Sequence, residues 1–238
     1  MAKPMTPDQL IALLKEWGIP YKEYKNWKNH NRNHKGNWGP INGLMVHHTG
    51  SDAPDQRELL YSGHAALPGP LSQVGLDQQG VIHLIGNGRC NHAGLGDSSI
   101  LKQVIAEDYG DTNLKPKKAD TDGNAHFVGM EIWYSGNHDM TAAQYNTLRR
   151  FAAAFITFYK WTEKSVIGHG EWQPGKWDPG YKKGTIKDMR VVRRDIATTK
   201  KAGPKAKPPV VTPPAPPVAK TLEQRVAELE KRVTKLGG

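Results

Sequence analysis

Residues 41–48, Ile-Asn-Gly-Leu-Met-Val-His-His, pass from apolar side chains into two adjacent histidines. The apolar part, from Leu44 to Val46, is typical of a strand that is buried in a sheet. A polar side chain beside buried residues costs free energy unless it has a partner. This stretch therefore predicts a buried strand whose end places His47 and His48 at a polar site.

The sequence on both sides of this strand predicts further strands that alternate with helices. Strands are expected at residues 71–76, 81–85, 127–133 and 165–167. Thr6 with Gln9, and Thr141 with Gln144, have the spacing of capping boxes, which indicates a helix after each threonine. Strands in alternation with helices favour an α/β fold over an all-β fold.

The composition of the 238 residues limits the class of protein. A single cysteine, Cys90, excludes an intramolecular disulfide framework and an all-cysteine zinc site. The longest apolar runs, such as Leu10–Leu14 and Phe151–Ile156, are much shorter than the ~20 residues of a membrane span. No secretory signal is expected either, because Lys15 ends the first apolar run and no small-residue cleavage site follows. We therefore expect no membrane insertion.

The net charge of +10 raises the question of an anionic partner. From Lys200 onward, nine basic and three acidic residues carry a net charge of +6, so the preceding 199 residues carry only +4. The basic excess has no interleaved aromatic residues, and no recognised nucleic-acid motif accompanies it. The charge therefore indicates a basic tail rather than a surface that binds nucleic acid.

Two segments are expected after the main domain. Residues 199–220 are predicted to form a Pro/Lys-rich, semi-rigid linker, because Ala202–Lys220 holds seven of the seventeen prolines. Residues 221–238 are predicted to form a short amphipathic helix. Its apolar residues have heptad spacing, at Leu222, Val226, Leu229, Val233 and Leu236. This spacing predicts a coiled-coil-like contact between copies of the chain, the alternative being a helix that folds back or frays.

Polar groups at the ends of the predicted strands are candidates for a metal site. His47 ends one strand and His169 follows another, and the loop from His169 to Gly180 is rich in glycine and proline, so Asp178 can return towards His169. Two imidazoles and one carboxylate, with a position left open for water, can form a catalytic zinc site. Because ten histidines offer many accidental combinations, a set of hydrogen-bonded histidines remains the alternative at this point.

Four ordered motifs resemble those of the type-2 N-acetylmuramoyl-L-alanine amidases. They are Val46-His-His-Thr-Gly50, Asn91-His-Ala-Gly94, Val128-Gly-Met-Glu-Ile132, and Gly168-His169 with Lys176-Trp-Asp-Pro-Gly180. The resemblance covers roughly residues 37–188, and residues 67–73 and 86–92 look especially like lysins of phages that infect actinobacteria. Members of this family are zinc enzymes that include phage lysins and share a fold with the peptidoglycan recognition proteins. The resemblance therefore implies a central mixed β-sheet flanked by helices.

The resemblance also implies roles for individual residues. His47, His169 and Asp178 match the three ligands of one Zn²⁺ ion, and many relatives carry a cysteine where Asp178 stands. The carboxylate keeps the negative charge of the ligand but lowers discrimination against harder metals. Glu131 matches a glutamate that acts beside the metal in some branches, and Lys176 matches the catalytic lysine.

Four further residues are expected near the substrate. His92 matches a histidine that lines the substrate groove, beside Asn91, and a structural role in its own turn is the alternative. Trp172 and Trp177 flank the predicted site, where they either stack on sugar rings or pack the loop. Other branches of the family place a tyrosine where this chain has Ser72, to which we assign no role.

The resemblance thus implies zinc-dependent hydrolysis of the bond between N-acetylmuramic acid and L-alanine in peptidoglycan. The expected organisation is an N-terminal helix and irregular segment at residues 1–36, packed on a zinc amidase domain at residues 37–198, followed by the linker and the terminal helix. The resemblance implies a phage lysin that stays in the host cytoplasm until lysis and then acts on the cell wall. A non-catalytic peptidoglycan-binding module on the same fold is the alternative, and the complete set of ligand positions favours the enzyme.

The predicted terminal helix makes the oligomeric state testable. If residues 221–236 form a coiled-coil contact, light scattering gives the full chain a mass above that of a monomer, whereas a chain that ends near Thr199 is a monomer. Monomers in both cases contradict the prediction.

Overall fold

The computed structural model describes residues 2–205. The helices are α1 (Pro7–Glu16), α2 (Arg57–Ser62), α3 (Ser98–Ala106), α4 (Ala142–Tyr159) and α5 (Met189–Ala202). The strands are β1 (Tyr21–Glu23), β2 (Gly43–His48), β3 (Gly63–His64), β4 (Leu67–Pro68), β5 (Val74–Leu76), β6 (Ile82–Leu84), β7 (Leu95–Gly96), β8 (Thr121–Asp122), β9 (Phe127–Ile132), β10 (Val166–Gly168), β11 (Gly180–Lys182) and β12 (Thr185–Ile186). Most of the predicted linker, and the helix predicted at residues 221–238, lie outside the described residues. Within residues 2–205, no helix is long and apolar enough to cross a membrane.

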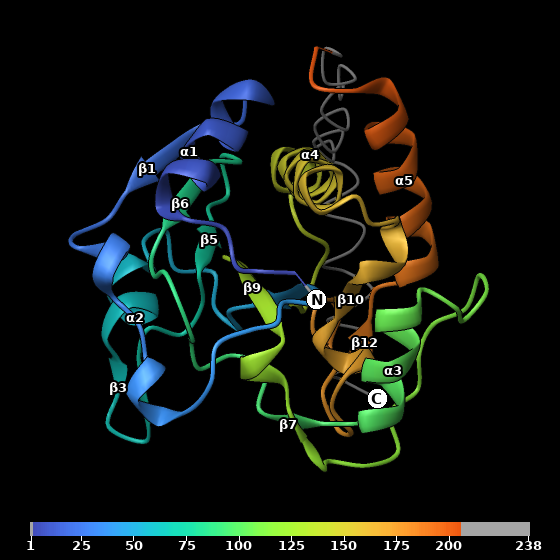
Figure 1. Ribbon diagram of the computed structural model, residues 1–238. Coiled ribbons are helices and arrows are strands. Elements are labelled where there is room, and N and C mark those ends of the chain that lie inside the picture. The colour runs from blue at the N-terminus through green and yellow to red at the C-terminus, as the bar shows by residue number, and fades with distance from the viewer. Residues whose placement is uncertain (1, 206–238) are drawn as a thin grey trace, which may run out of the picture. The chain divides into compact units, whose positions relative to one another are not determined.

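Six strands form the central sheet in the order β1-β6-β5-β9-β2-β10 (Figure 1). The neighbours β5 and β6 are antiparallel, and the other four pairs are parallel. The antiparallel pair is joined by the predicted turn, in which Asp77 Oδ1 accepts hydrogen bonds from the backbone N–H groups of Gln79 and Val81. The prediction of an α/β fold with a central mixed sheet is confirmed.

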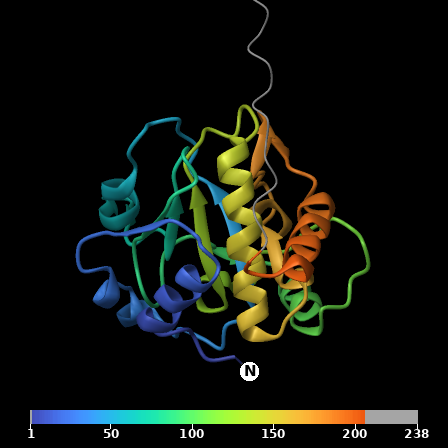
Figure 2. The same ribbon diagram turned by 90° about the horizontal axis from the view of Figure 1, so that it is seen from above.

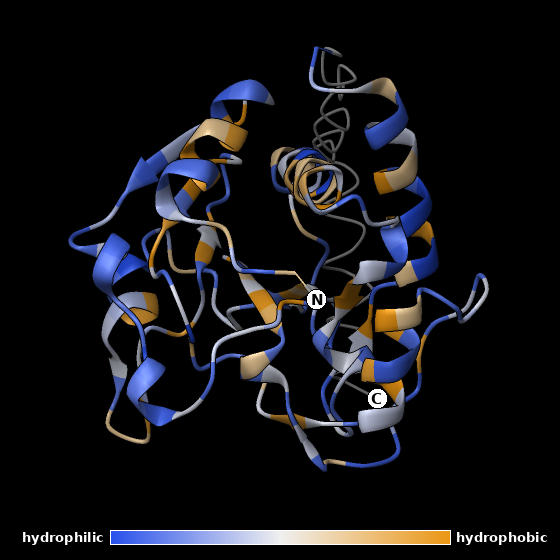
Figure 3. Cartoon of the chain, in the orientation of Figure 1, coloured by the Kyte–Doolittle hydropathy of each residue, from blue (hydrophilic) through white to orange (hydrophobic). Residues whose placement is uncertain are grey.

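One face of the sheet is covered by α1, α4 and α5 (Figures 1 and 2). Leu44 and Val46 of β2 lie on this face, in one apolar cluster with Leu148 and Phe155 of α4 and Val192 of α5. Figure 3 shows hydrophobic and hydrophilic residues interleaved along α5, as expected of a helix that buries one side. Full burial of such a side chain contributes about 1.5–3 kcal/mol, so this cluster is a main source of stability.

The opposite face of the sheet changes from apolar to polar along the strands. Met45 and Phe127 lie on this face and belong to a second apolar cluster with α3 and Trp172. Side chains alternate between the faces of a strand, so His47 and Glu131 lie on the same face as these residues, closer to the strand ends. This face of the sheet is therefore apolar where α3 packs on it and polar at the carboxyl ends of β2 and β9.

The N-terminal segment packs on the domain and contributes a strand to the sheet. The predicted capping box of Thr6 and Gln9 is present at the start of α1, and Leu14 and Trp17 are buried in the core. Strand β1, which was not predicted, pairs in parallel with β6. The N-terminal residues are therefore part of the central sheet as well as a layer upon it.

Helix α5 crosses the predicted boundary between domain and linker at residues 198 and 199. The helix continues to Ala202, and the Lys200 ammonium donates a hydrogen bond of 2.6 Å to the Trp161 carbonyl oxygen. The change to a basic composition at Lys200 therefore begins inside a packed helix, and the folded domain extends a few residues further than predicted.

A buried ion pair connects α5 to the loop after β10. The guanidinium of Arg193 donates two hydrogen bonds to the Glu171 carboxylate, at 2.8 and 3.1 Å, and both side chains are at most 5% exposed. The same carboxylate accepts hydrogen bonds from the backbone N–H groups of Gly168 and Leu114. Because Gly168 directly precedes His169, this network fixes the backbone next to a candidate metal ligand.

Removal of the guanidinium should destabilise the fold strongly. In Arg193→Met the Glu171 carboxylate stays buried without its charged partner, and we expect the free energy of unfolding to fall by about 3–5 kcal/mol. Chemical denaturation measures this change. Arg194→Met is the matched control, because Arg194 is exposed on the same helix and its loss should cost within about 0.5 kcal/mol. Equal stabilities of the two variants would contradict the role of the pair.

Candidate metal centre

The first candidate ligand, His47, lies near the end of β2 between two parallel neighbours. β2 pairs with β9 on one side and with β10 on the other, and His47 is in register with Glu131. The imidazole is almost completely buried, with 2% of the side chain exposed. The apolar strand thus places a histidine inside the protein, as the sequence predicted.

The other two candidate ligands lie at the two ends of one loop. His169 follows β10 directly and begins a short 3-10 helix, His169–Glu171. The loop then returns, and the Gly170 N–H donates a hydrogen bond of 2.9 Å to the Asp178 carbonyl oxygen. His169 Nδ1 lies 3.0 Å from Asp178 Oδ2. The glycine- and proline-rich sequence therefore makes the turn that brings these side chains together.

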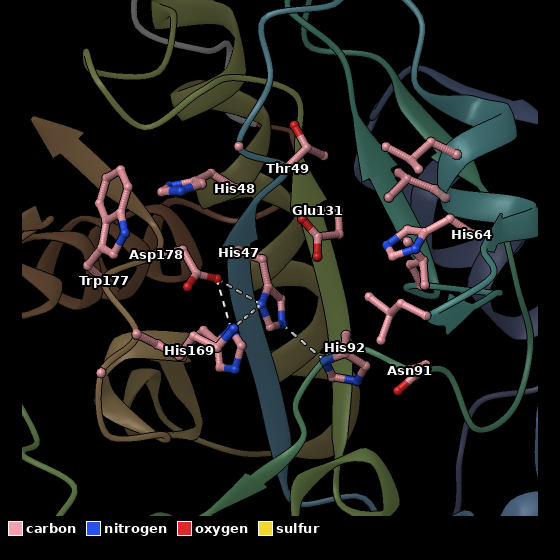
Figure 4. A pocket seen from close by; sticks show the side chains of 17 residues that line it. His47, His48, Thr49, His64, Asn91, His92, Glu131, His169, Trp177 and Asp178 are labelled. Carbon is pink, nitrogen blue, oxygen red and sulfur yellow. Dashed lines mark hydrogen bonds and ion pairs between the residues drawn. The ribbon is translucent and has the colours of Figure 1, made fainter. Parts of the chain in front are cut away.

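Three potential ligand atoms converge at this point (Figure 4). His47 Nδ1 and His169 Nδ1 are 3.1 Å apart, and Asp178 Oδ2 lies 3.0 Å from each of them. Ligand atoms of a tetrahedral zinc site with bonds of about 2.0–2.1 Å lie about 3.3 Å from one another, so the triangle has nearly the required size. Among the described residues, this is the one such group of histidine, cysteine or acidic side chains. The residues therefore fit one zinc ion.

The protonation states of these groups also favour metal binding. Burial lowers the pKa of His47 to about 4, and a charge on His169 acts in the same direction. Burial by itself raises the pKa of the Asp178 carboxyl, but its interactions with the adjacent imidazoles of His169 and His47 outweigh this effect and hold the pKa well below its usual range. At neutral pH a neutral imidazole and a carboxylate are thus available, which are the forms that bind metal.

Glu131 lies beside the cluster on the adjacent strand (Figure 4). Its Oε2 atom is buried and has no hydrogen-bond partner among the described residues. Burial, followed by the negative charge of Asp178, raises the pKa of Glu131 well above its usual value, while Lys176 acts in the opposite direction. A buried oxygen atom without a hydrogen-bond partner costs free energy, so the position of Oε2 calls for a chemical role.

A pocket of about 610 Å³ opens over the cluster. Lys176 and Trp177 line it near Asp178, and Lys176 is exposed to solvent. Leu59, His64 and Leu67 line the pocket as well, from α2, β3 and β4, and His64 faces the cluster from the far wall in Figure 4. The pocket thus has a polar metal-binding side and a largely aliphatic side, the second of which was not predicted.

Asn91 and His92 line the same pocket between these two sides. The Asn91 side-chain amide donates a hydrogen bond of 3.3 Å to the Pro68 carbonyl oxygen. His92 is buried, and its Nδ1 atom lies 3.0 Å from His47 Nε2. Burial, and then charges on His47 and His169, lower the pKa of His92 well below its usual value.

Trp177 and His48 form the edge of the pocket next to Asp178. Their ring centroids are 4.5 Å apart in an edge-on arrangement. His48 Nδ1 also accepts a hydrogen bond of 2.9 Å from the Gly180 N–H. His48 is therefore used to hold the returning loop, while Trp177 is placed where a substrate can contact it.

Trp172, by contrast, does not line the pocket. Its indole is completely buried and packs against Phe127, with 5.2 Å between the ring centroids. A Cβ atom at Gly96 would lie 2.1 Å from the ring, so this glycine leaves the space that the indole fills. The expected substrate contact of Trp172 is wrong, and the alternative of a packing role is correct.

Ser72, to which no role was assigned, is also buried, and its hydroxyl donates a hydrogen bond to the Val74 carbonyl oxygen.

One residue that supports a ligand was missed in the sequence. The Gln173 side-chain oxygen lies 3.1 Å from His169 Nε2, on the side of the ring away from the cluster. An acceptor in this position places the proton on Nε2 and leaves Nδ1 free for a metal. The spacing of four residues from His169 is the signal that was available.

A buried cluster of two histidines and an aspartate, beside a carboxyl group at a sheet edge, is typical of metal-dependent hydrolases. Residues 37–181 match the N-acetylmuramoyl-L-alanine amidase family. The match covers more than half of the chain, and the protein belongs to this family. No curated protein matches the sequence.

Several solved structures resemble this one. The endolysin amidase LysCS from Clostridium intestinale URNW is 18% identical, with a TM-score of 0.44, over 69% of this chain and 88% of that chain. A selenomethionine derivative of AmpD is 19% identical, with a TM-score of 0.48, over 73% and 93%. The Staphylococcus aureus hydrolase AmiA, in complex with its ligand, is 14% identical, with a TM-score of 0.48, over 87% and 97%. The family assignment rests on the sequence match alone.

The cluster predicts binding of one zinc ion. At a free zinc concentration of about 100 times the dissociation constant, the wild-type protein should gain about 2.7 kcal/mol of stability. His169→Ala and Asp178→Ala should lose both this gain and the metal itself, measured by elemental analysis after dialysis. His64→Ala is the matched control, because this exposed histidine lines the same pocket outside the cluster. Zinc retention in the His169 and Asp178 variants would contradict the assignment.

Proposed function

We propose that this protein hydrolyses the amide bond between N-acetylmuramic acid and L-alanine in peptidoglycan, with one zinc ion held by His47, His169 and Asp178. The observation that carries the proposal is the convergence of these three ligand atoms within 3.1 Å, beside the buried Oε2 atom of Glu131, which has no hydrogen-bond partner among the described residues. A zinc ion bound there would supply a Lewis acid that polarises the amide carbonyl and lowers the pKa of water.

Glu131 is proposed to act as general base and then as general acid. Burial raises the pKa of the Glu131 carboxyl, so it binds a proton more readily than an exposed one, which suits a group that must accept a proton and then return it. Glu131 removes a proton from the attacking water and delivers it to the departing amine of L-alanine. The first products are the carboxylic acid of the lactyl group and the neutral amine of L-alanine, so one proton passed through Glu131 balances the hydrolysis. At neutral pH the acid then releases its proton to solvent and the amine takes one up.

Lys176 is proposed to stabilise the negative charge that develops on the carbonyl oxygen. Its ammonium group belongs to the loop that also carries Asp178, two residues further on, and lines the same pocket. A cation in this position acts on the transition state more than on the neutral substrate amide, and so it lowers the barrier. The aliphatic side of the pocket, with Leu59 and Leu67, is available for apolar groups of the substrate.

The family and the resemblance to phage lysins support a biological role in lysis of the host cell wall. We propose that the protein stays in the host cytoplasm until lysis and then acts on the wall. The basic residues from Lys200 onward would favour retention near anionic wall polymers through salt-sensitive attraction. Removal of the residues after Pro204 should then weaken wall binding at low salt; unchanged binding would contradict this role of the tail.

Substitution of the two catalytic candidates should separate catalysis from metal binding. Glu131→Gln should lower the rate by about 10²–10⁴-fold, and Lys176→Ala by about 10²–10³-fold, while both variants retain zinc. The measurement is the loss of turbidity of purified actinobacterial cell walls, with release of N-terminal alanine as the product assay. Lys183→Ala is the matched control, because Lys183 is exposed in the hairpin after the site. Full activity of the Glu131 and Lys176 variants would exclude this mechanism.

A non-catalytic peptidoglycan-binding module is the alternative function. The same assay distinguishes the two, because an enzyme lyses the wall, loses activity on addition of a chelator and regains it with zinc. Binding to the wall without release of alanine, at any zinc concentration, would favour the module.

A further inference from the structure

His92 makes a hydrogen bond with each of its ring nitrogens, and neither bond involves solvent. Nδ1 lies 3.0 Å from His47 Nε2, and Nε2 lies 3.0 Å from the carbonyl oxygen of Phe127. The ring is buried, although His92 lines the pocket, and it lies beside His47 in Figure 4. His92 thus connects the Phe127 carbonyl group of β9 to the imidazole of His47, a candidate metal ligand.

The Phe127 carbonyl fixes the direction of both hydrogen bonds. A carbonyl oxygen can only accept, so the proton between these groups lies on His92 Nε2. In the neutral ring, Nδ1 then has a lone pair and accepts the bond from His47, which places a proton on His47 Nε2. The proton-free nitrogen of His47 is consequently Nδ1, the atom that faces His169 and Asp178.

The fold provides a specific place for this ring. A Cβ atom at Gly129 of β9 would lie 2.7 Å from the His92 Cγ atom, so the ring can lie on the strand only because residue 129 has no side chain. The Asn124 side-chain oxygen accepts hydrogen bonds from the backbone N–H groups of His92 and Ala93, both at 2.8 Å. Ring and backbone are therefore held independently of any substrate.

We infer that His92 is a positioning residue that sets the tautomer of His47, and that it does not recognise the substrate. This inference deepens the proposed function and rests on zinc binding at the His47 cluster. An outer hydrogen-bond partner of this kind orients the ligand ring and presents a lone pair to the metal without touching it.

Two variants of the same shape test the inference. His92→Leu and His92→Asn have the same branching, but only asparagine retains an oxygen acceptor near the position of Nδ1. Competition with a chromophoric chelator should show zinc binding that is about 10–100-fold weaker in His92→Leu and less than about threefold weaker in His92→Asn. The KM for soluble peptidoglycan fragments should stay unchanged in His92→Asn. Wild-type zinc affinity in His92→Leu, or a raised KM at unchanged affinity, would overturn the inference.

A measurement on the unaltered chain keeps the test valid if a variant fails to fold. Long-range ¹H–¹⁵N spectra of zinc-free protein labelled at histidine should show His47 with its proton on Nε2; a proton on Nδ1 would overturn the inference. Absence of zinc binding by the wild-type protein would instead refute the proposed function, and the tautomer of His47 would still decide the inference by itself.

Discussion

Parallel pairing of three adjacent strands is the constraint on which the site depends. β2 lies between β9 and β10, and the carboxyl ends of all three strands meet at one edge of the sheet. The register places His47 opposite Glu131, and Val46 opposite Gly168, so that His169 begins just beyond. A shift of one residue would turn His47 or Glu131 to the apolar face under α4. The Glu171 carboxylate, which is paired with Arg193, accepts a hydrogen bond from the Gly168 N–H and so fixes the end of β10 in this register.

The parts of the fold that were predictable from the sequence carry local signals. The capping boxes of α1 and α4, and the apolar run of β2, act within a few residues and hold in the structure. Strand β1 has no such signal, because its pairing with β6 is a tertiary contact of a short polar segment. Helix α5 was not predicted, because its composition is basic and only a few of its residues are buried in the core. Helix α3 does carry a signal, the N-cap Asp97, which was overlooked.

The site was predictable to the extent that its chemistry lies in motifs. His47, His169 and Asp178 converge as the resemblance implied, because strand ends and a returning loop are encoded close to them in sequence. Trp172 was misassigned because proximity to His169 along the chain does not determine whether a side chain faces the pocket or the core. The aliphatic wall with Leu59 and the pairing of Glu171 with Arg193 depend on contacts between distant segments, for which a single sequence offers no pattern.

The ion pair of Arg193 and Glu171 has a consequence for how this domain can be exchanged between proteins. The match to the family ends at residue 181, before α5 begins at Met189. A fragment cut at residue 181 would carry every side chain of the metal centre, yet it would leave the Glu171 carboxylate buried without its cation. The smallest transferable module is therefore longer than its catalytic motifs. In a chimeric protein, the crossover point that keeps this ion pair intact lies after Ala202.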